Sequence, residues 1–248
     1  MSTNEKDLDR EEMLRLLSRL EQVLRDRGQK VRLYVIGGAN MAIAVNESRT
    51  TKDIDAVINE GDDALRAAAE EVARTEPGLG PDWINSEFTG FYGNRGGITW
   101  QWFDNRDSDE PTTLLATRSL EVELASPEMM LALKSIAGRP QDREDAFQLM
   151  RLTGITTPKA MSDNLTTFTG ERVWIAQNTP GMILHIDPGF HFIFDNLPDD
   201  LRAAYSQAEF RERGQCGYRL IDPQTGETFG YCRRKAGHSG KHRSGLFR

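Results

Sequence analysis

The residues whose type and spacing could do chemistry begin with two carboxylates, Asp53 and Asp55, which flank Ile54. Segment 52–58 alternates polar and apolar residues as a strand does, so both carboxylates would point to one face. Carboxylate oxygens are ligands that Mg²⁺ prefers, and nucleoside triphosphates arrive already bound to that ion. The pair therefore predicts a magnesium and phosphate site, although two such acids can also form a solvated strand edge.

A pair of glycines lies upstream of the carboxylates. Gly37 and Gly38 follow the apolar run 31–36, expected to be a buried strand, and precede segment 39–45, expected to be helical. Glycine lets the backbone approach a phosphate closely, and a helix start offers N–H donors. With Arg49 and Thr50 in between, this order favours in-line attack on an α-phosphorus, with pyrophosphate leaving. The plainer alternative is an ordinary turn after a strand.

A second group of charged residues lies on two expected helices. Lys134 stands in the apolar helix 127–137, which Ser126 would cap, and the break at 138–140 contains Arg139. The next helix, 142–152, carries Asp142 and Asp145. A cation on a helix beside a carboxylate pair would itself need a ligand or a partner. The alternative is a set of surface ion pairs across a helical corner, worth little each.

With its residues in this order, the chain resembles the nucleotidyltransferase superfamily related to DNA polymerase β. It is most similar to the AbiEii-type toxins and DUF6036-type proteins, whose signature is Gly-Gly followed by Arg-x-Thr-x-Asp-[Ile/Leu]-Asp. That signature is filled by Arg49, Thr51, Asp53, Ile54 and Asp55. The family's second block is filled by Lys134, Ala137, Arg139, Asp142 and Asp145. The two blocks cover residues 31–155 and leave the C-terminal part uncovered.

The resemblance implies a polymerase-β-like core that transfers a nucleoside monophosphate from an NTP with two Mg²⁺ ions. Asp53 and Asp55 would hold the metal, and Lys134 and Asp142 would belong to the catalytic group. The nucleotide would be bound by Gly37, Gly38, Arg49, Thr51 and Arg139. The superfamily usually adds a third carboxylate from a neighbouring strand. Glu123 or Glu121, on the expected strand 119–125, would supply it, with Asp104 as a weaker candidate.

The resemblance also implies an acceptor and a partner. RNA, above all tRNA, is the expected acceptor, and many relatives are toxins of toxin–antitoxin or phage-defence systems, with a cognate antitoxin. A protein side chain or a small molecule would keep the chemistry and change the acceptor. A hypothesis of another class is a nucleotidyltransferase fold without catalysis that binds nucleic acid or a protein partner, since fold does not fix function.

The C-terminal tail carries both cysteines and two of the four histidines of the chain. Cys216, Cys232, His238 and His242 are spaced C-x15-C-x5-H-x3-H. Two thiolates and two imidazoles suit tetrahedral Zn²⁺, which would stabilise a segment poor in apolar residues. Residues 211–248 carry a net charge of +6 and the remainder −13, so the tail could bind an RNA backbone. The alternative is a solvated basic tail with a free thiol.

The expected elements form an α/β (α+β) pattern with a mixed sheet and flanking helices. Helices are expected over 11–27, 62–75 and 197–213, and a linker that leads into a strand over 166–177. The domain prediction is a nucleotidyltransferase-like core at 1–158, a connecting α/β region at 159–213 and the zinc tail at 214–248. With 248 residues, no long apolar run and an acidic, polar start, the chain is expected to be cytoplasmic, without a membrane partner.

Overall fold

The computed structural model describes residues 6–86, 106–137, 142–169, 193–194, 196–212, 219–221 and 228–231. Its centre is a mixed sheet in the order β3-β2-β1-β5-β4. The strands are β1 (Val31–Val35), β2 (Ile54–Glu60), β3 (Ile84–Asn85), β4 (Thr112–Ala116) and β5 (Leu120–Leu124). β1 pairs antiparallel with β2 and parallel with β5. The predicted α/β class with a mixed sheet is therefore confirmed.

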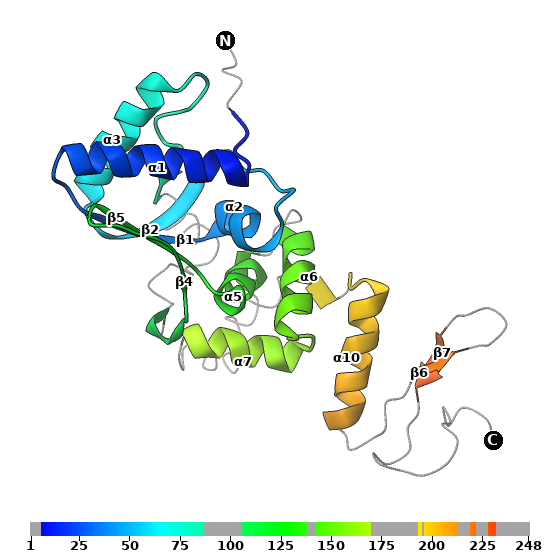
Figure 1. Cartoon of the computed structure of the whole chain (residues 1–248). Coiled ribbons are helices and arrows are strands. Elements are labelled where there is room, and N and C mark those ends of the chain that lie inside the picture. The colour runs from blue at the N-terminus through cyan, green and yellow to red at the C-terminus, as the bar shows by residue number, and fades with distance from the viewer. Residues whose placement is uncertain are drawn as a thin grey trace, which may run out of the picture.

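One face of the sheet is covered by α1 (Arg10–Asp26) and α3 (Asp62–Thr75), as Figure 1 shows. Alternate residues of β1, β2 and β5, such as Val35, Ile54 and Val122, are fully buried on this face. They pack against the apolar stripe of α1. This helix begins after its N-cap residue, Asp9, whose carboxylate accepts a hydrogen bond from the Glu12 N–H at 2.8 Å. The N-terminal helix and the helix at 62–75 were both predicted.

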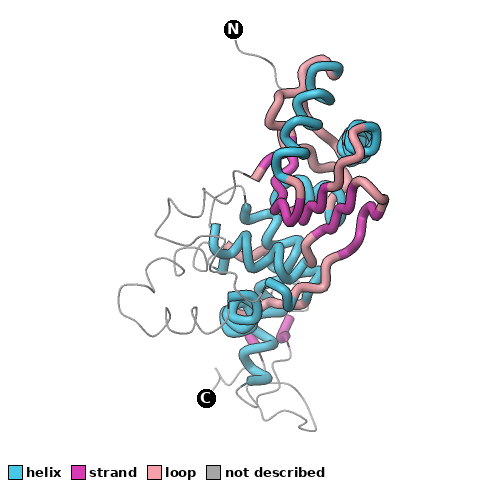
Figure 2. The backbone as a smooth tube through the Cα atoms, turned by 90° about the vertical axis from the view of Figure 1, so that its left-hand side faces the viewer, coloured by secondary structure: helices cyan, strands magenta, loops and turns pink. Residues whose placement is uncertain are grey.

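The other helices form a second core on the far side of the sheet. They are α5 (Pro127–Ala137), α6 (Asp142–Thr153) and α7 (Pro158–Thr169), and the start of α10 (Asp199–Glu212) joins them. Figure 2 shows the strands between these two helical groups. The prediction over 166–177 of a linker that leads into a strand is wrong at 166–169, because these residues end α7, and residues 170–177 lie outside the described residues. Phe168 is buried in the same cluster as α5 and α6, which stabilises the helix.

A short helix connects β1 to β2 and starts at the glycine pair. α2 (Gly37–Asn40) runs directly into a π-helical turn, Met41–Val45. The side chain of Asn40 is buried and donates to the carbonyls of Val35 and Ala125, each at 3.0 Å. Asn40 therefore holds the start of α2 against the ends of β1 and β5. Because the glycine pair begins α2, Asn40 also holds the glycine pair in place.

The remaining described elements are a 3₁₀ turn at Arg106–Ser108 and a hairpin of β6 (Arg219–Ile221) and β7 (Thr228–Tyr231). Helix α10 confirms the helix expected over 197–213. Within the described ranges, no helix is both long and apolar enough to span a bilayer.

Candidate functional site

The glycine pair and the carboxylates come together at the end of β1. Gly37 has φ +68°, and a Cβ at this position would lie 2.6 Å from Asp55 Oδ2. A Cβ at Gly38 would lie 2.9 Å from Thr51 Oγ1. Glycine is therefore required at Gly37 both by its left-handed backbone and by its contact with the carboxylate. The main chain of the glycine pair is lined by Asp55 on one side and by Thr51 on the other.

Asp53 reaches the same place through Thr51. The Thr51 hydroxyl donates to Asp53 Oδ1 at 3.4 Å, and the main chain of Thr51 is held by two hydrogen bonds with the buried Leu8. The strand predicted over 52–58 is observed as β2 at Ile54–Glu60, so Asp53 precedes the strand and only Asp55 lies in it. Asp53 also lines a hollow of about 170 Å³ together with Lys6, Lys52 and Asn85.

Arg49 joins this end of the sheet to the second helical core. Its guanidinium forms an ion pair with Asp145 of α6, and it lies 4.0 Å from the position of a Cβ at Gly38. Lys134 of α5 lies between Asp142 Oδ1 at 2.6 Å and Asp145 Oδ2 at 2.8 Å. Lys134, Asp142 and Asp145 are all buried. We call Arg49, Lys134, Asp142 and Asp145 the buried ion cluster.

This cluster corrects one part of the structural alternative for the second block, and the functional interpretation stays a prediction. The alternative of surface ion pairs is wrong, because both carboxylates and the ammonium group are shielded from water. Lys134 is engaged with two carboxylates of its own, so its place in the structure is that of a link between α5 and α6. Through Asp145 the link extends to Arg49, which stands beside the glycine pair.

The expectation of a third carboxylate from Glu121 or Glu123 does not fit the sheet order. β5 neighbours β1, and β1 separates it from β2. Glu123 lies opposite Tyr34, whereas the Asp55 carbonyl accepts a hydrogen bond from Ile36. Glu123 and Asp55 are therefore separated by two strand spacings across the sheet and by two residues along it. Together these offsets put their Cα atoms about 12 Å apart. Glu121 is paired with Arg32 instead, with Nε and Oε2 3.0 Å apart.

The strand that does neighbour β2 on its other side is β3, and it carries a residue that the sequence analysis missed. Asn85 lies opposite Asp55 in the parallel register. Its amide nitrogen donates to the Asp82 carbonyl at 3.1 Å. An amide oxygen is a ligand that hard cations accept. Asn85 is the second residue of β3, and it follows Trp83 and Ile84, which are both buried.

The donor set around the glycine pair fits a magnesium ion that arrives with a nucleotide. Mg²⁺ keeps several waters and is commonly held by one or two carboxylates together with substrate phosphates. Asp53 and Asp55 supply the carboxylates, and Asn85 lies beside Asp55. Across the described ranges, no group of three or more His, Cys, Asp or Glu side chains is placed to hold a metal ion.

Several predicted site residues lie outside the described residues. Among them are Arg139 and Asp104, and the four zinc ligands Cys216, Cys232, His238 and His242. The zinc site and the place of Arg139 therefore stay predictions. Comparison of the chain with protein-family models, with curated proteins and with solved structures finds no match in any of the three.

Proposed function

We propose that the chain transfers a nucleoside monophosphate from a Mg²⁺-bound NTP to a hydroxyl acceptor. The observation that carries this proposal is the contact of Asp55 with the left-handed Gly37, beside Thr51 and Asp53. Carboxylates placed directly against a glycine main chain are suited to a metal-bound phosphate, because the metal bridges the carboxylates and the phosphate oxygens.

In this proposal each residue has a separate task. The N–H groups at the start of α2 bind phosphate oxygens, since the first turn of a helix leaves its N–H groups without helical partners. Arg49 adds positive charge beside them, and Asp145 and Lys134 are positioning residues that hold Arg49. The metal would supply charge stabilisation for the departing pyrophosphate.

The transfer forms one bond to the α-phosphorus and breaks another. The acceptor oxygen forms a bond to the α-phosphorus, and the bond from that phosphorus to the bridging oxygen breaks. Pyrophosphate leaves with the electron pair of the broken bond. The acceptor proton would pass to a carboxylate of the pair, and the position of Asp53 on the lining of a hollow supports Asp53 for this role.

The broader expectations for this chain stay proposals that depend on the transfer. RNA as acceptor is supported by the +6 charge of residues 211–248. A role as a toxin, an antitoxin partner and a structural zinc ion in the tail are likewise proposed from the sequence.

The direct test is incubation of the full chain with each α-³²P-labelled NTP, Mg²⁺ and total RNA. Products are separated into RNA, protein and small-molecule fractions. We expect label in one fraction, and its loss in the double variant Asp53→Asn/Asp55→Asn. The matched control is Asp62→Asn/Asp63→Asn, which removes two exposed carboxylates at the start of α3 and should retain transfer. Equal labelling by both double variants would refute the assignment of Asp53 and Asp55.

A second candidate function is nucleotide binding without transfer, as part of a binding module. The observation that favours it is Asn85, an amide and not a carboxylate, opposite Asp55. The two candidates differ in one measurement. Binding without transfer is supported if the chain binds an Mg²⁺-bound NTP but labels no acceptor in any fraction. The Asp53→Asn/Asp55→Asn variant should then lose nucleotide binding.

A further inference from the structure

The segment before α1 pairs with the part of the chain that carries the carboxylate site. Residues 6–8, which we call the strap, lie beside the connection from the π-helical turn to β2. Leu8 and Thr51 exchange two main-chain hydrogen bonds, from the Leu8 N–H at 2.7 Å and from the Thr51 N–H at 3.0 Å. Figure 1 shows the strap, at the dark-blue start of the described chain, entering α1 beside the loop that follows α2. Both main-chain groups of Thr51 are therefore held by one residue of the strap.

The strap is anchored to the body of the protein chiefly through Leu8. The Leu8 side chain is fully buried in the core formed by α1, α3 and the sheet. The Lys6 N–H donates to the Gly78 carbonyl at 3.1 Å. Asp7 and Lys52 form an ion pair at 2.8 Å, which contributes little because both side chains are more than half exposed. Leu8 is therefore the residue that fixes the strap in place.

Thr51 passes this position on to the site. Its hydroxyl donates to Asp53 Oδ1 at 3.4 Å, and it lies 2.9 Å from the place of a Cβ on Gly38. Asp53 precedes β2, so it lies outside the ladder of the sheet. Lys6 of the strap and Asp53 line the same hollow. The strap and the first carboxylate therefore belong to one surface and are joined through Thr51.

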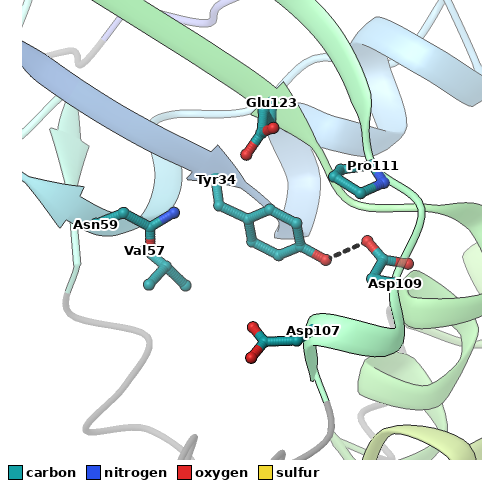
Figure 3. A pocket seen from close by; sticks show the side chains of 7 residues that line it. All are labelled: Tyr34, Val57, Asn59, Asp107, Asp109, Pro111 and Glu123. Carbon is teal, nitrogen blue, oxygen red and sulfur yellow. Dashed lines mark hydrogen bonds between the residues drawn. The ribbon is translucent and has the colours of Figure 1, made fainter.

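Asp55 is held in a different way from Asp53. It lies within β2, which pairs with β1 on one side and with β3 on the other. Figure 3 shows Val57, two residues further along β2, beside Tyr34 of β1, in agreement with the register of the two strands. The Asp55 carbonyl accepts a hydrogen bond from the Ile36 N–H at 3.0 Å. Asp55 is thus positioned by the sheet, whereas Asp53 is positioned by the strap.

We propose that Leu8 is a positioning residue of the carboxylate site, which acts through Thr51 on Asp53. This role rests on the proposed function, in which Asp53 takes the acceptor proton. A shift of Asp53 lowers the rate of transfer, because a catalytic group acts only from the correct geometry. Asp55 and the glycine pair keep their places, since the sheet and Asn40 hold them. Loss of the Leu8 side chain therefore lowers kcat and leaves the KM for the NTP nearly unchanged.

The test compares two leucines of one core, Leu8 and Leu20, which are both fully buried. Leu8→Ala and Leu20→Ala remove the same atoms, so both variants should lose stability. In transfer assays with the full chain, Mg²⁺ and the NTP that the wild type uses, Leu8→Ala should lower kcat by about tenfold or more and change KM less than twofold. Leu20→Ala should keep kcat within twofold, at a temperature where thermal unfolding shows both variants folded. Leu8→Met, which nearly conserves the side-chain volume, should restore at least half of the wild-type kcat.

Amide hydrogen exchange, followed by NMR, tests the positioning without a transfer assay. In Leu8→Ala the exchange of the Thr51 N–H should increase more than that of the β2 amides, whereas Leu20→Ala should change both alike. Equal losses of kcat in the two alanine variants, or unchanged exchange at Thr51 in Leu8→Ala, would overturn the proposal. A wild-type chain that transfers no nucleotide refutes the proposed function, and the exchange measurement still decides whether Leu8 holds Thr51.

Discussion

Two networks of the molecule contain the same charges and differ in where they lie. The buried ion cluster has two cations and two carboxylates between the sheet end and the second helical core. The α1 surface network, Lys6, Glu12, Arg15 and Glu76, also has two cations and two carboxylates, and Arg19 lies 3.7 Å from Glu76 as a further cation. The Lys134 side chain is 5% exposed, whereas that of Lys6 is 37% exposed.

The difference teaches that burial, and not the number of ion pairs, decides what one charge contributes. Removing one partner from a buried pair leaves a desolvated charge behind, and this is strongly destabilising. A charge at the surface loses only a partner that water replaces. The buried ion cluster must therefore be complete to be tolerated, while the α1 surface network can lose members.

The largest expected effect comes from removing the central cation of the buried ion cluster. Lys134→Ala leaves Asp142 and Asp145 facing each other without a shared ammonium group, and we expect a loss of about 3–5 kcal/mol in the free energy of unfolding. Lys6→Ala in the α1 surface network is the matched change and should cost about 1 kcal/mol or less. Urea denaturation measures both. Similar losses for the two variants would break the comparison.

The next effect concerns the contact of Gly37 with Asp55. Gly37→Ala combines a left-handed backbone with a clash against Asp55 Oδ2, and we expect a loss of about 2–3 kcal/mol. Gly28→Ala is the matched control, since its φ of +63° is similar and a Cβ there meets no atom within 4 Å. The difference between the two variants in denaturant unfolding isolates the contact. If both variants lose the same amount, the contact with Asp55 has no energetic effect.

A smaller loss is expected at Asn40. Asn40→Leu leaves the carbonyls of Val35 and Ala125 without the amide that binds them, and we expect about 1–3 kcal/mol. Asn46→Leu, at the partly exposed end of the π-helical turn, serves as the comparison. Thermal unfolding should show a clear decrease of Tm for Asn40→Leu and a smaller one for Asn46→Leu. The reverse order would show that Asn40 does not hold the helix start.

The smallest effect is a pH dependence in the α1 surface network. Hydrogen bonds from Arg15 and, secondarily, Lys6 lower the pKa of Glu12 from 4.5 to about 2, against the opposing effect of burial. Because the folded pKa is the lower one, this stabilisation is complete above about pH 4.5 and is lost as the pH falls toward 2. Tm measured across this range should fall less for Glu12→Gln than for the wild type. Parallel curves would contradict the assignment.

The elements that carry apolar periodicity were predictable from the sequence, and long-range pairings were not. The stripe of α1 and the helix at 62–75 follow directly from residue spacing. Lys134 amid apolar neighbours indicates a buried charge that needs a partner. Its connection through Asp145 to Arg49 joins residues 96 positions apart, and no local pattern records it.

The candidate site shows the same limit. Gly37, Gly38, Asp53 and Asp55 were predicted from local spacing and Thr51 from the family resemblance, and the structure brings them together. The position of Glu123 relative to Asp55 depends on sheet order, and alternation within a strand says nothing about which strand lies beside it. Asn85 was missed since β3 has only two residues and gives too short a pattern to detect.

The parallel pairing of β1 with β5 also has a consequence for synthesis on the ribosome. Val31 pairs with Leu120, so one edge of β1 has no partner until nearly ninety further residues have been translated. Non-local pairings of this kind slow folding and leave unpaired strand edges exposed during synthesis. The antiparallel pairing with β2 is complete by Glu60. A nascent chain arrested before residue 120 should therefore contain the β1–β2 pair and depend on chaperones, and release of the arrest should restore protease resistance.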